Sequence, residues 1–350
     1  MTRIAAVRGV LAEHRYPQHE LTEAFADAFA GGARERALLR RFHQSAQVQS
    51  RYLALPLEQT CELNDFGAKN DAFIAVGTEL GARAVRTALD EAGFAPDEVD
   101  LIVFTTVTGV AAPSLDARIA TEVGFRTDVK RMPLFGLGCV AGAAGIARLH
   151  DYLSGHPDQI AVLLSVELCS LTVQLGDASV ANMVASGLFG DGAAAVVAVG
   201  EDRAGDGPQV VASRAHLYPE TQRTMGWDVG ATGLSIVLDA EVPTLVERYL
   251  AGDVEQLLAP RGLAVADVTG WVCHPGGPKV IDAITATLGL GPDALEITWR
   301  SLAEVGNLSS ASVLHVLSDT LDKRSFPPGS PGVLMAMGPG FCSELVLLNW

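Results

Sequence analysis

A cysteine at the start of a small-residue helix is the first feature of this sequence that suggests chemistry. Cys139 lies in the segment 136–145, whose other members are Gly, Ala, Leu and Val. The dipole of a helix stabilises a thiolate at its N-terminus, and cysteines so placed have pKa values of about 3.5–7.5 instead of ~8.5. The segment therefore indicates a nucleophile, although close helix packing around an inert sulfur explains the small residues equally well.

A histidine and an asparagine later in the chain have related surroundings. His274 ends the apolar run 271–273 and is followed by Pro-Gly-Gly, which cannot extend a strand. A side chain held at a strand end suits a rigid acid, base or oxyanion donor, although a purely structural histidine is the commoner case. Asn307 follows Gly306 at the expected start of a helix, where asparagine ordinarily serves as the N-cap.

A faint internal duplication connects these residues. The pattern Leu-x3-Gly-x5-Val begins at Leu89 and again at Leu258, 169 residues later, each time before an apolar run. Gly138-Cys139 and Gly306-Asn307 are related by an offset of 168. If the two halves share one fold, their helix starts face a common interface and His274 reaches the same rim. The sequence thus predicts one site containing a thiol, an imidazole and a carboxamide.

The composition describes a large protein with an extensive apolar interior. Of the 350 residues 49% are apolar, and the formal net charge is −16, which argues against binding to nucleic acid or to an anionic membrane surface. No apolar run approaches the ~18 residues of a membrane-spanning helix, and the N-terminus lacks a signal-peptide core, so we expect a cytoplasmic protein. Five scattered cysteines exclude a zinc ribbon or a disulfide framework, and we expect no metal ion.

Periodicity predicts a layered α/β protein with helices packed between and outside two sheets. The predicted helices cover residues 72–92, 140–153, 242–258, 278–288 and 307–321. The predicted strands cover residues 101–106, 160–166, 193–199, 332–337 and 343–348. The most loop-like stretch is 202–208, so we expect an N-terminal half at 1–205, which carries the cysteine, and a C-terminal half at 206–350, which carries the histidine and the asparagine.

The motifs around these residues resemble those of type III polyketide synthases, the chalcone synthase-like branch of the thiolase superfamily. They are Gly138-Cys139, His274-Pro-Gly-Gly-Pro278, Gly306-Asn307-Leu-Ser-Ser-Ala311 and Gly338-Pro-Gly340. The resemblance runs from about Ala5 to Trp350 and implies a thiolase-like five-layered αβαβα sandwich of two duplicated halves, and a homodimer. The segments that begin at Phe104, Arg131 and Ser165 look most like those of bacterial alkylresorcinol and alkylpyrone synthases.

The resemblance implies an acyltransferase with a role for each catalytic residue. Cys139 would accept an acyl group from coenzyme A as a thioester. His274 and Asn307 would hold the enolate oxygen that forms when malonyl-CoA loses carbon dioxide, and preplaced donors in a dry pocket stabilise such a charge strongly. Acyl-CoA and malonyl-CoA would be substrates, and no cofactor is implied.

The resemblance also implies residues that bind the substrates. The expected substrate pocket consists of Phe189, Ala112, Cys169, Thr172, Ile236, Gly338, Pro339 and Gly340. Arg41 and Lys279 match regions that meet the coenzyme A phosphates. Arg41 also belongs to a group of five arginines between Arg34 and Arg51, which indicates either a phosphate-binding patch or a solvated helix face.

Departures from the family pattern direct the substrate prediction. Ala112, Cys169 and Ile236 stand where plant members carry Met, Thr and Phe, and smaller or more flexible walls favour a medium- or long-chain fatty acyl-CoA starter. The main prediction is therefore iterative condensation with malonyl-CoA and cyclisation to an alkylpyrone or alkylresorcinol. The alternatives are a tetrahydroxynaphthalene-type synthase that uses malonyl-CoA alone, an initiating β-ketoacyl-ACP synthase, and a cysteine hydrolase whose asparagine orients the histidine. Starter length, extender unit, number of extensions and ring type do not follow from the residues.

Overall fold

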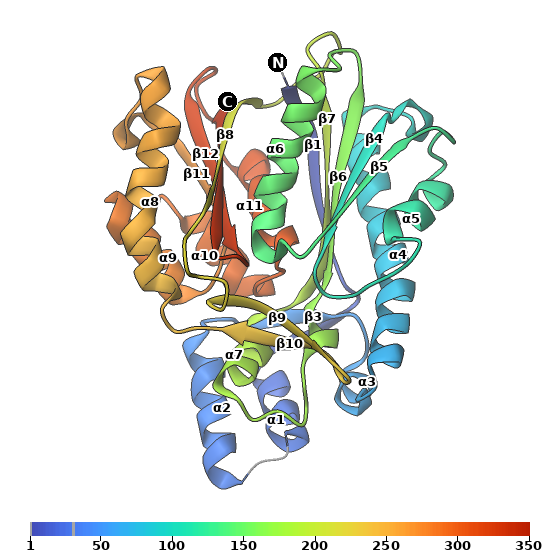
Figure 1. Cartoon of the computed structure of the whole chain (residues 1–350), viewed down its shortest axis with the longest axis vertical. Coiled ribbons are helices and arrows are strands. Elements are labelled where there is room, and N and C mark those ends of the chain that lie inside the picture. Colours follow the sequence, from blue (N-terminus) through green and yellow to red (C-terminus); the bar gives the residue numbers. More distant parts are fainter. Residues whose placement is uncertain (1, 30–31) are drawn as a thin grey trace.

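Five layers of secondary structure cross the molecule in the computed structural model, which describes residues 2–29 and 32–350. Figure 1 shows the layers from left to right, with helices outside, between and again outside the strands. The outer helices are α8 (Val242–Leu258) and α9 (Pro278–Leu288) on one side, and α4 (Phe66–Ala92) and α5 (Leu115–Val123) on the other. The central layer consists of α6 (Ala141–Ser154) and α11 (Ser310–Lys323). The predicted layered architecture is confirmed.

The strands of both halves form one nine-stranded sheet in place of the two expected sheets. Its order is β11-β12-β13-β8-β1-β7-β6-β4-β5. Within this sheet the two halves are joined by the pairing of β1 with β8, which consists of Thr2 with Val210 and Arg3 with Gln209. The strands are β1 (Thr2–Leu11), β4 (Leu101–Thr106), β5 (Lys130–Phe135), β6 (Ile160–Leu168), β7 (Asp191–Val199), β8 (Gln209–Leu217), β11 (Gly270–Cys273), β12 (Pro331–Gly338) and β13 (Cys342–Asn349).

The duplication expected from the sequence is visible in the strand order. The run β4-β6-β7-β1 is parallel at its first pairing and antiparallel at the next two, and β11-β12-β13-β8 repeats this pattern. Gly93 and Gly262, 169 residues apart, end corresponding helical segments with φ values of 74° and 67°. Only the first half has the additional edge strand β5. The boundary at residues 205 and 206 lies in the loop from β7 to β8 and stays a prediction.

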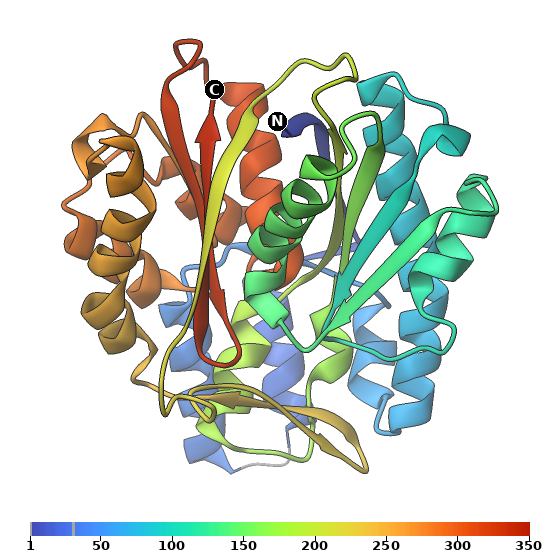
Figure 2. The ribbon, with the colours of Figure 1, turned by 45° about the horizontal axis from the view of Figure 1, so that its top comes forward.

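Smaller elements gather below the layers in Figure 1. The turn Gly138–Val140 and the turn Cys169–Thr172 are 3-10 helices. Figure 2, turned by 45°, shows the same elements beneath the ends of the large strands. These smaller helices and strands are β2 (His14–Pro17), α1 (Gln18–Ala28), α2 (Ala33–Ser45), β3 (Ser50–Leu53), α3 (Leu57–Glu62), α7 (Val180–Leu188), β9 (Met225–Gly230), β10 (Gly233–Leu238) and α10 (Glu296–Val305).

Two helix boundaries differ from the sequence prediction for identifiable reasons. α4 begins six residues earlier than expected because Asp65 caps it, accepting a hydrogen bond of 2.9 Å from the Ala68 backbone N–H. α11 begins at Ser310 and not at Asn307, because Gly306 and Ser309 have φ values of 75° and 49°, which a helix does not tolerate. Asn307 is therefore not an N-cap. No helix in the ranges 2–29 and 32–350 is long and apolar enough to cross a membrane.

The central helices approach closely at a glycine. A Cβ atom added to Gly142 on α6 would collide with the backbone oxygen of Ser310 and would lie 2.6 Å from Cγ1 of Val313, both on α11. Because these contacts involve backbone and a fully buried side chain, neither partner can move aside easily. The glycine thus permits the starts of the two central helices to meet.

We expect Gly142→Ala to lower the free energy of unfolding by about 1–3 kcal/mol, the usual cost of overpacking a core. The measurement is urea-induced unfolding followed by circular dichroism. Gly176→Ala is the matched control, because a Cβ there meets no atom within 4 Å. Equal unfolding midpoints for the two variants would contradict the role assigned to this contact.

Candidate active site

Cys139 lies in a tight turn against which Gly338 and Pro339 of the C-terminal half pack. The turn precedes α6, and Gly138 adopts a φ of 56°. A Cβ on Gly338 would lie 2.7 Å from the Val140 nitrogen, and a Cβ on Gly138 would lie 2.8 Å from Cδ of Pro339. The glycines therefore allow the 338–340 turn to pack directly against the cysteine turn, which aims the sulfur while leaving it 6% exposed.

Asn307 is held by backbone hydrogen bonds on both sides. Its N–H donates to the Leu188 oxygen (2.9 Å), and its carbonyl accepts from the Gly190 N–H (3.0 Å), which makes an isolated parallel bridge with Phe189. The side-chain Oδ1 accepts from the Ser309 N–H at 2.8 Å. Because Oδ1 is occupied, the amino group of the carboxamide is the part of Asn307 that can donate to the Cys139 sulfur or to a ligand.

A single cavity of about 680 Å³ brings the three predicted catalytic residues together. Cys139, His274 and Asn307 all line it. Cys139 belongs to the N-terminal half, whereas His274, more than 130 residues later, and Asn307 belong to the C-terminal half. Its volume falls in the range of about 300–1,000 Å³ that is typical of small-molecule sites. The convergence predicted from the duplication is thus present in the structure.

His274 faces this cavity as a neutral imidazole. His274 follows β11, and its backbone N–H donates to the Met335 backbone oxygen at 3.0 Å. Burial lowers the pKa of the imidazole to about 3. Both ring nitrogens are buried, and neither has a hydrogen-bond partner among the residues that the structure describes. Buried polar atoms without partners are unusual and indicate that a ligand supplies the missing hydrogen bonds.

The thiol of Cys139 differs from the sequence expectation. Burial raises its pKa to about 12; hydrogen bonding with Ser309 lowers the pKa, and the nearby carboxyl group of Glu167 raises it further. The predicted lowering of the pKa is wrong, because desolvation of the sulfur outweighs the effect of the helix start. Thiol and imidazole are both neutral here, so a thiolate has to form by transfer of the thiol proton to a base.

Two polar residues of the site escaped the sequence analysis. Ser309 lies within hydrogen-bonding distance of the Cys139 sulfur, at 3.8 Å between Sγ and Oγ. Glu167 is fully buried and accepts hydrogen bonds from the Thr108 hydroxyl (3.0 Å) and the Ser310 hydroxyl (2.5 Å). A charged residue within the apolar run 160–168 was a usable signal for Glu167, whereas the φ of Ser309 has no sequence signature.

The predicted binding residues divide into three groups. Phe189, Arg41 and Lys279 line the cavity, and the last two are exposed at its outer end. Gly338 and Pro339 pack against the cysteine turn, and neither they nor Gly340 line the cavity. Cys169 and Thr172 are buried outside the lining. Ala112 is exposed and Ile236 lies on β10, so neither forms a cavity wall within the described chain. Their binding roles stay predictions.

The cysteine hydrolase alternative does not fit this geometry. In such an enzyme the asparagine orients the histidine, which requires a hydrogen bond between the two side chains. Oδ1 of Asn307 bonds to Ser309, and in the described residues neither ring nitrogen of His274 has a partner. The Asn307 carboxamide instead hydrogen-bonds to the Cys139 sulfur, which lowers the pKa of the thiol.

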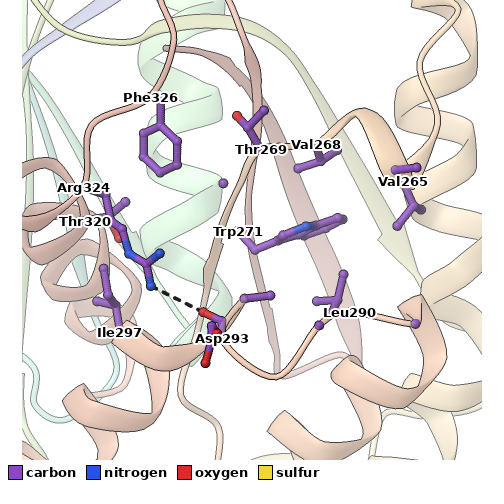
Figure 3. Close-up of a pocket in the computed structure, with 15 residues that line it drawn as sticks. Val265, Val268, Thr269, Trp271, Leu290, Asp293, Ile297, Thr320, Arg324 and Phe326 are labelled. Carbon is purple, nitrogen blue, oxygen red and sulfur yellow. Dashed lines mark hydrogen bonds between the residues drawn. The ribbon is translucent and has the colours of Figure 1, made fainter.

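A second, smaller cavity of about 280 Å³ lies at the start of β11 (Figure 3). Trp271 and Phe326 contribute to its walls, and Arg324 donates to the backbone oxygen of Asp293 at 3.4 Å. None of the predicted catalytic or binding residues lines it. The larger cavity, which all three predicted catalytic residues line, is therefore the candidate active site.

The layers and the cysteine site define an acyl-transferring enzyme of thiolase-like fold, and comparisons with known proteins narrow the class. Residues 2–203 match the N-terminal domain of chalcone and stilbene synthases, and residues 209–349 match the C-terminal domain. The chain belongs to this family, the type III polyketide synthases.

Similar proteins cover the full chain. A 1,3,6,8-tetrahydroxynaphthalene synthase of Streptomyces peucetius subsp. caesius is 57% identical over 352 residues, covering 100% of this chain and 93% of that protein. A putative chalcone synthase of Bacillus subtilis (strain 168) is 35% identical and covers 88% of this chain and 87% of that protein. The crystal structure of 1,3,6,8-tetrahydroxynaphthalene synthase from Streptomyces coelicolor A3(2) superposes with a TM-score of 0.94 at 30% identity, covering 99% of both chains.

We expect His274→Gln to slow alkylation of Cys139 by iodoacetamide at least tenfold at pH 7, because the thiol loses the base that takes up its proton. Mass spectrometry of the Cys139 peptide gives the rate. Cys61, half-buried and outside the cavity, serves as an internal control whose alkylation stays constant. An unchanged Cys139 rate in the variant would show that thiolate formation does not depend on this imidazole.

Proposed function

We propose that this protein is a 1,3,6,8-tetrahydroxynaphthalene synthase that condenses malonyl-CoA without a separate starter. The observation that carries the proposal is the 57% identity, over the whole chain, to a synthase of that name. A further relative of the same name, from Streptomyces griseus, is 32% identical over 97% of this chain. The catalytic trio around one cavity supports the chemistry that such a product needs.

The carbon balance of the reaction is simple. Five malonyl-CoA molecules that lose five molecules of carbon dioxide supply the ten carbons of a naphthalene skeleton. Five molecules of coenzyme A and one of water leave as well. No redox step occurs, so no oxidant or reductant is required.

The residues of the cavity can perform each condensation. The proton of the Cys139 thiol passes to His274, which lines the same cavity, and this leaves a thiolate beside an imidazolium. The thiolate attacks the thioester carbonyl of malonyl-CoA, and the coenzyme A sulfur leaves as a thiol by taking the proton from the imidazolium of His274. When a further malonyl-CoA loses carbon dioxide, the amino group of Asn307 and the imidazole donate to the enolate oxygen. The enolate carbon then attacks the thioester carbonyl on Cys139, which forms the new carbon–carbon bond, breaks the bond to the Cys139 sulfur and leaves the extended chain on coenzyme A. The released Cys139 thiolate takes up this chain again and displaces coenzyme A before the next condensation.

The mouth of the cavity suits a coenzyme A thioester. Arg41 on α2 and Lys279 on α9 are exposed there, and two cations at an entrance attract the phosphates of the carrier. Apolar side chains such as Phe189, Met337 and Phe341 line the cavity deeper in. A low-dielectric interior favours loss of the charged carboxylate as neutral carbon dioxide.

The fatty acyl starter has less support. That prediction relied on Ala112 and Ile236 as small or flexible walls, and neither lines the cavity of the described chain. Alkylpyrone or alkylresorcinol formation therefore ranks second. The experiment below separates the two functions.

We expect purified protein supplied with malonyl-CoA alone to release a product of formula C10H8O4. With uniformly 13C-labelled malonyl-CoA, mass spectrometry should show label in all ten carbons. Addition of hexanoyl- to stearoyl-CoA should divert less than a tenth of the malonyl-CoA into other products. Absence of product until a fatty acyl-CoA is added would reverse the ranking of the two functions.

We also propose that the protein is a homodimer, because large apolar side chains are exposed around the cysteine turn. Phe135 is 54% exposed at the end of β5, and Leu217 is 69% exposed beside Gly340. Exposed apolar patches of this kind mark association surfaces.

Sedimentation velocity should give twice the mass of the chain, and Phe135→Glu should shift the protein to monomer by placing a charge in the interface. Val229→Glu is the matched control, since Val229 is 72% exposed but lies on the separate β9–β10 hairpin. A monomeric parent protein would contradict the proposal.

A further inference from the structure

Arg51 is an unusual residue because its long charged side chain is 1% exposed. It belongs to β3, outside the large sheet, and the sequence analysis placed it in an arginine group suited to phosphates or solvent. The structure separates it from that group. A charged side chain is buried only when specific partners compensate the loss of hydration, so its contacts indicate what the charge is for.

The guanidinium of Arg51 holds the segment 187–189. Nη1 donates to the Phe189 oxygen at 2.8 Å, and Nε donates to Oε1 of Gln18 at 2.9 Å. Gln18 in turn donates through Nε2 to the Gly187 oxygen at 2.7 Å. Arg51 and Gln18 thus bind the two ends of this segment together.

The segment 187–189 and the following Gly190 also hold the backbone of Asn307 by hydrogen bonds. The Asn307 N–H donates to the Leu188 oxygen, and the Gly190 N–H donates to the Asn307 oxygen. A Cβ on Gly306 would lie 2.7 Å from the Leu188 oxygen and 3.2 Å from Cδ of Arg51. The arginine side chain therefore packs against both partners of this cross-half bridge.

A buried carboxylate balances the charge. Asp191 is 0% exposed, attracts Arg51, and accepts hydrogen bonds from the Ala54 N–H (2.6 Å) and the Ser170 N–H (2.7 Å). The planar fork of arginine reaches two acceptors in fixed directions, which the single ammonium of lysine does not do.

We infer that Arg51 is a positioning residue, which aligns Phe189 and Asn307 in the cavity by anchoring the backbone bridge between the two halves. Its effect on decarboxylation rests on the proposed function. Displacement of catalytic groups by about 1 Å costs roughly 100-fold in rate. Arg51 does not itself line the cavity, so its influence passes through Phe189 and Asn307, which do.

The test uses Arg51→Met and Arg51→Lys in the full chain. Hydrogen exchange of peptides containing Gly190 and Asn307, followed by mass spectrometry, should rise at least tenfold in Arg51→Met, because both amides belong to the anchored bridge. Decarboxylation of malonyl-CoA should lose about 10- to 100-fold in kcat with KM unchanged. Arg51→Lys keeps the charge and one donor, so it should recover part of both readouts.

Two comparisons separate positioning from general destabilisation. Asp100→Asn alters another buried carboxylate, which pairs with Arg126 and the Ile160 N–H at the opposite strand ends, and should lower stability without changing kcat. If Arg51→Met does not fold, Gln18→Met removes one acceptor of the guanidinium and should produce the same changes in smaller degree.

Unchanged hydrogen exchange at the bridge in Arg51→Met, or in Gln18→Met where the former does not fold, would overturn the inference. So would a loss of kcat no larger than that of Asp100→Asn at equal stability. A parent protein that does not decarboxylate malonyl-CoA would instead refute the proposed function, and the hydrogen-exchange result would still decide the positional role.

Discussion

The contact between α6 and α11 is the constraint on which the site depends. Gly142 allows the two helices to meet at their first turns, so that Cys139, just before α6, and Asn307, just before α11, approach a shared cavity from opposite halves. His274 at the end of β11 reaches the same place because β11 lies in the half that contributes α11. A larger residue at this crossing would separate the groups that have to act together.

Burial determines the charge state of these groups as well as their positions. It raises the pKa of the Cys139 thiol and lowers that of the His274 imidazole, so both groups are neutral near pH 7. Neutral donors suit the decarboxylation that we propose, in which the substrate loses its carboxylate as carbon dioxide, because they stabilise the charge that develops on the enolate oxygen. The cationic side chains of Arg41 and Lys279 line the cavity but are exposed, so they remain hydrated and avoid the free-energy cost of desolvation.

Buried polar residues join the halves around this cavity. Glu167, beneath the cysteine, accepts hydrogen bonds from Thr108 in the first half and Ser310 in the second. The Phe189–Asn307 bridge is a second joint, with Arg51 against it. Such groups are costly to bury unless hydrogen bonds compensate the lost hydration, and those bonds fix the directions in which Glu167 and Arg51 point. The halves are therefore joined by directional contacts near the site and by apolar packing elsewhere.

Residue types and periodicity determined most elements and the duplication, because these depend on spacing along the chain, and the duplication together with the family motifs pointed to Cys139, His274 and Asn307 as the candidate site. The predicted helices 242–258 and 278–288 and the strand 101–106 coincide with α8, α9 and β4. The Leu-x3-Gly-x5-Val repeat likewise marked two equivalent turns. Tertiary structure alone decided the neutral state of Cys139, the exposure of Ala112, the hidden place of Arg51 and the start of α11 after Asn307. Each of these follows from desolvation or from contacts between residues far apart in the chain, and no local pattern of side chains encodes either.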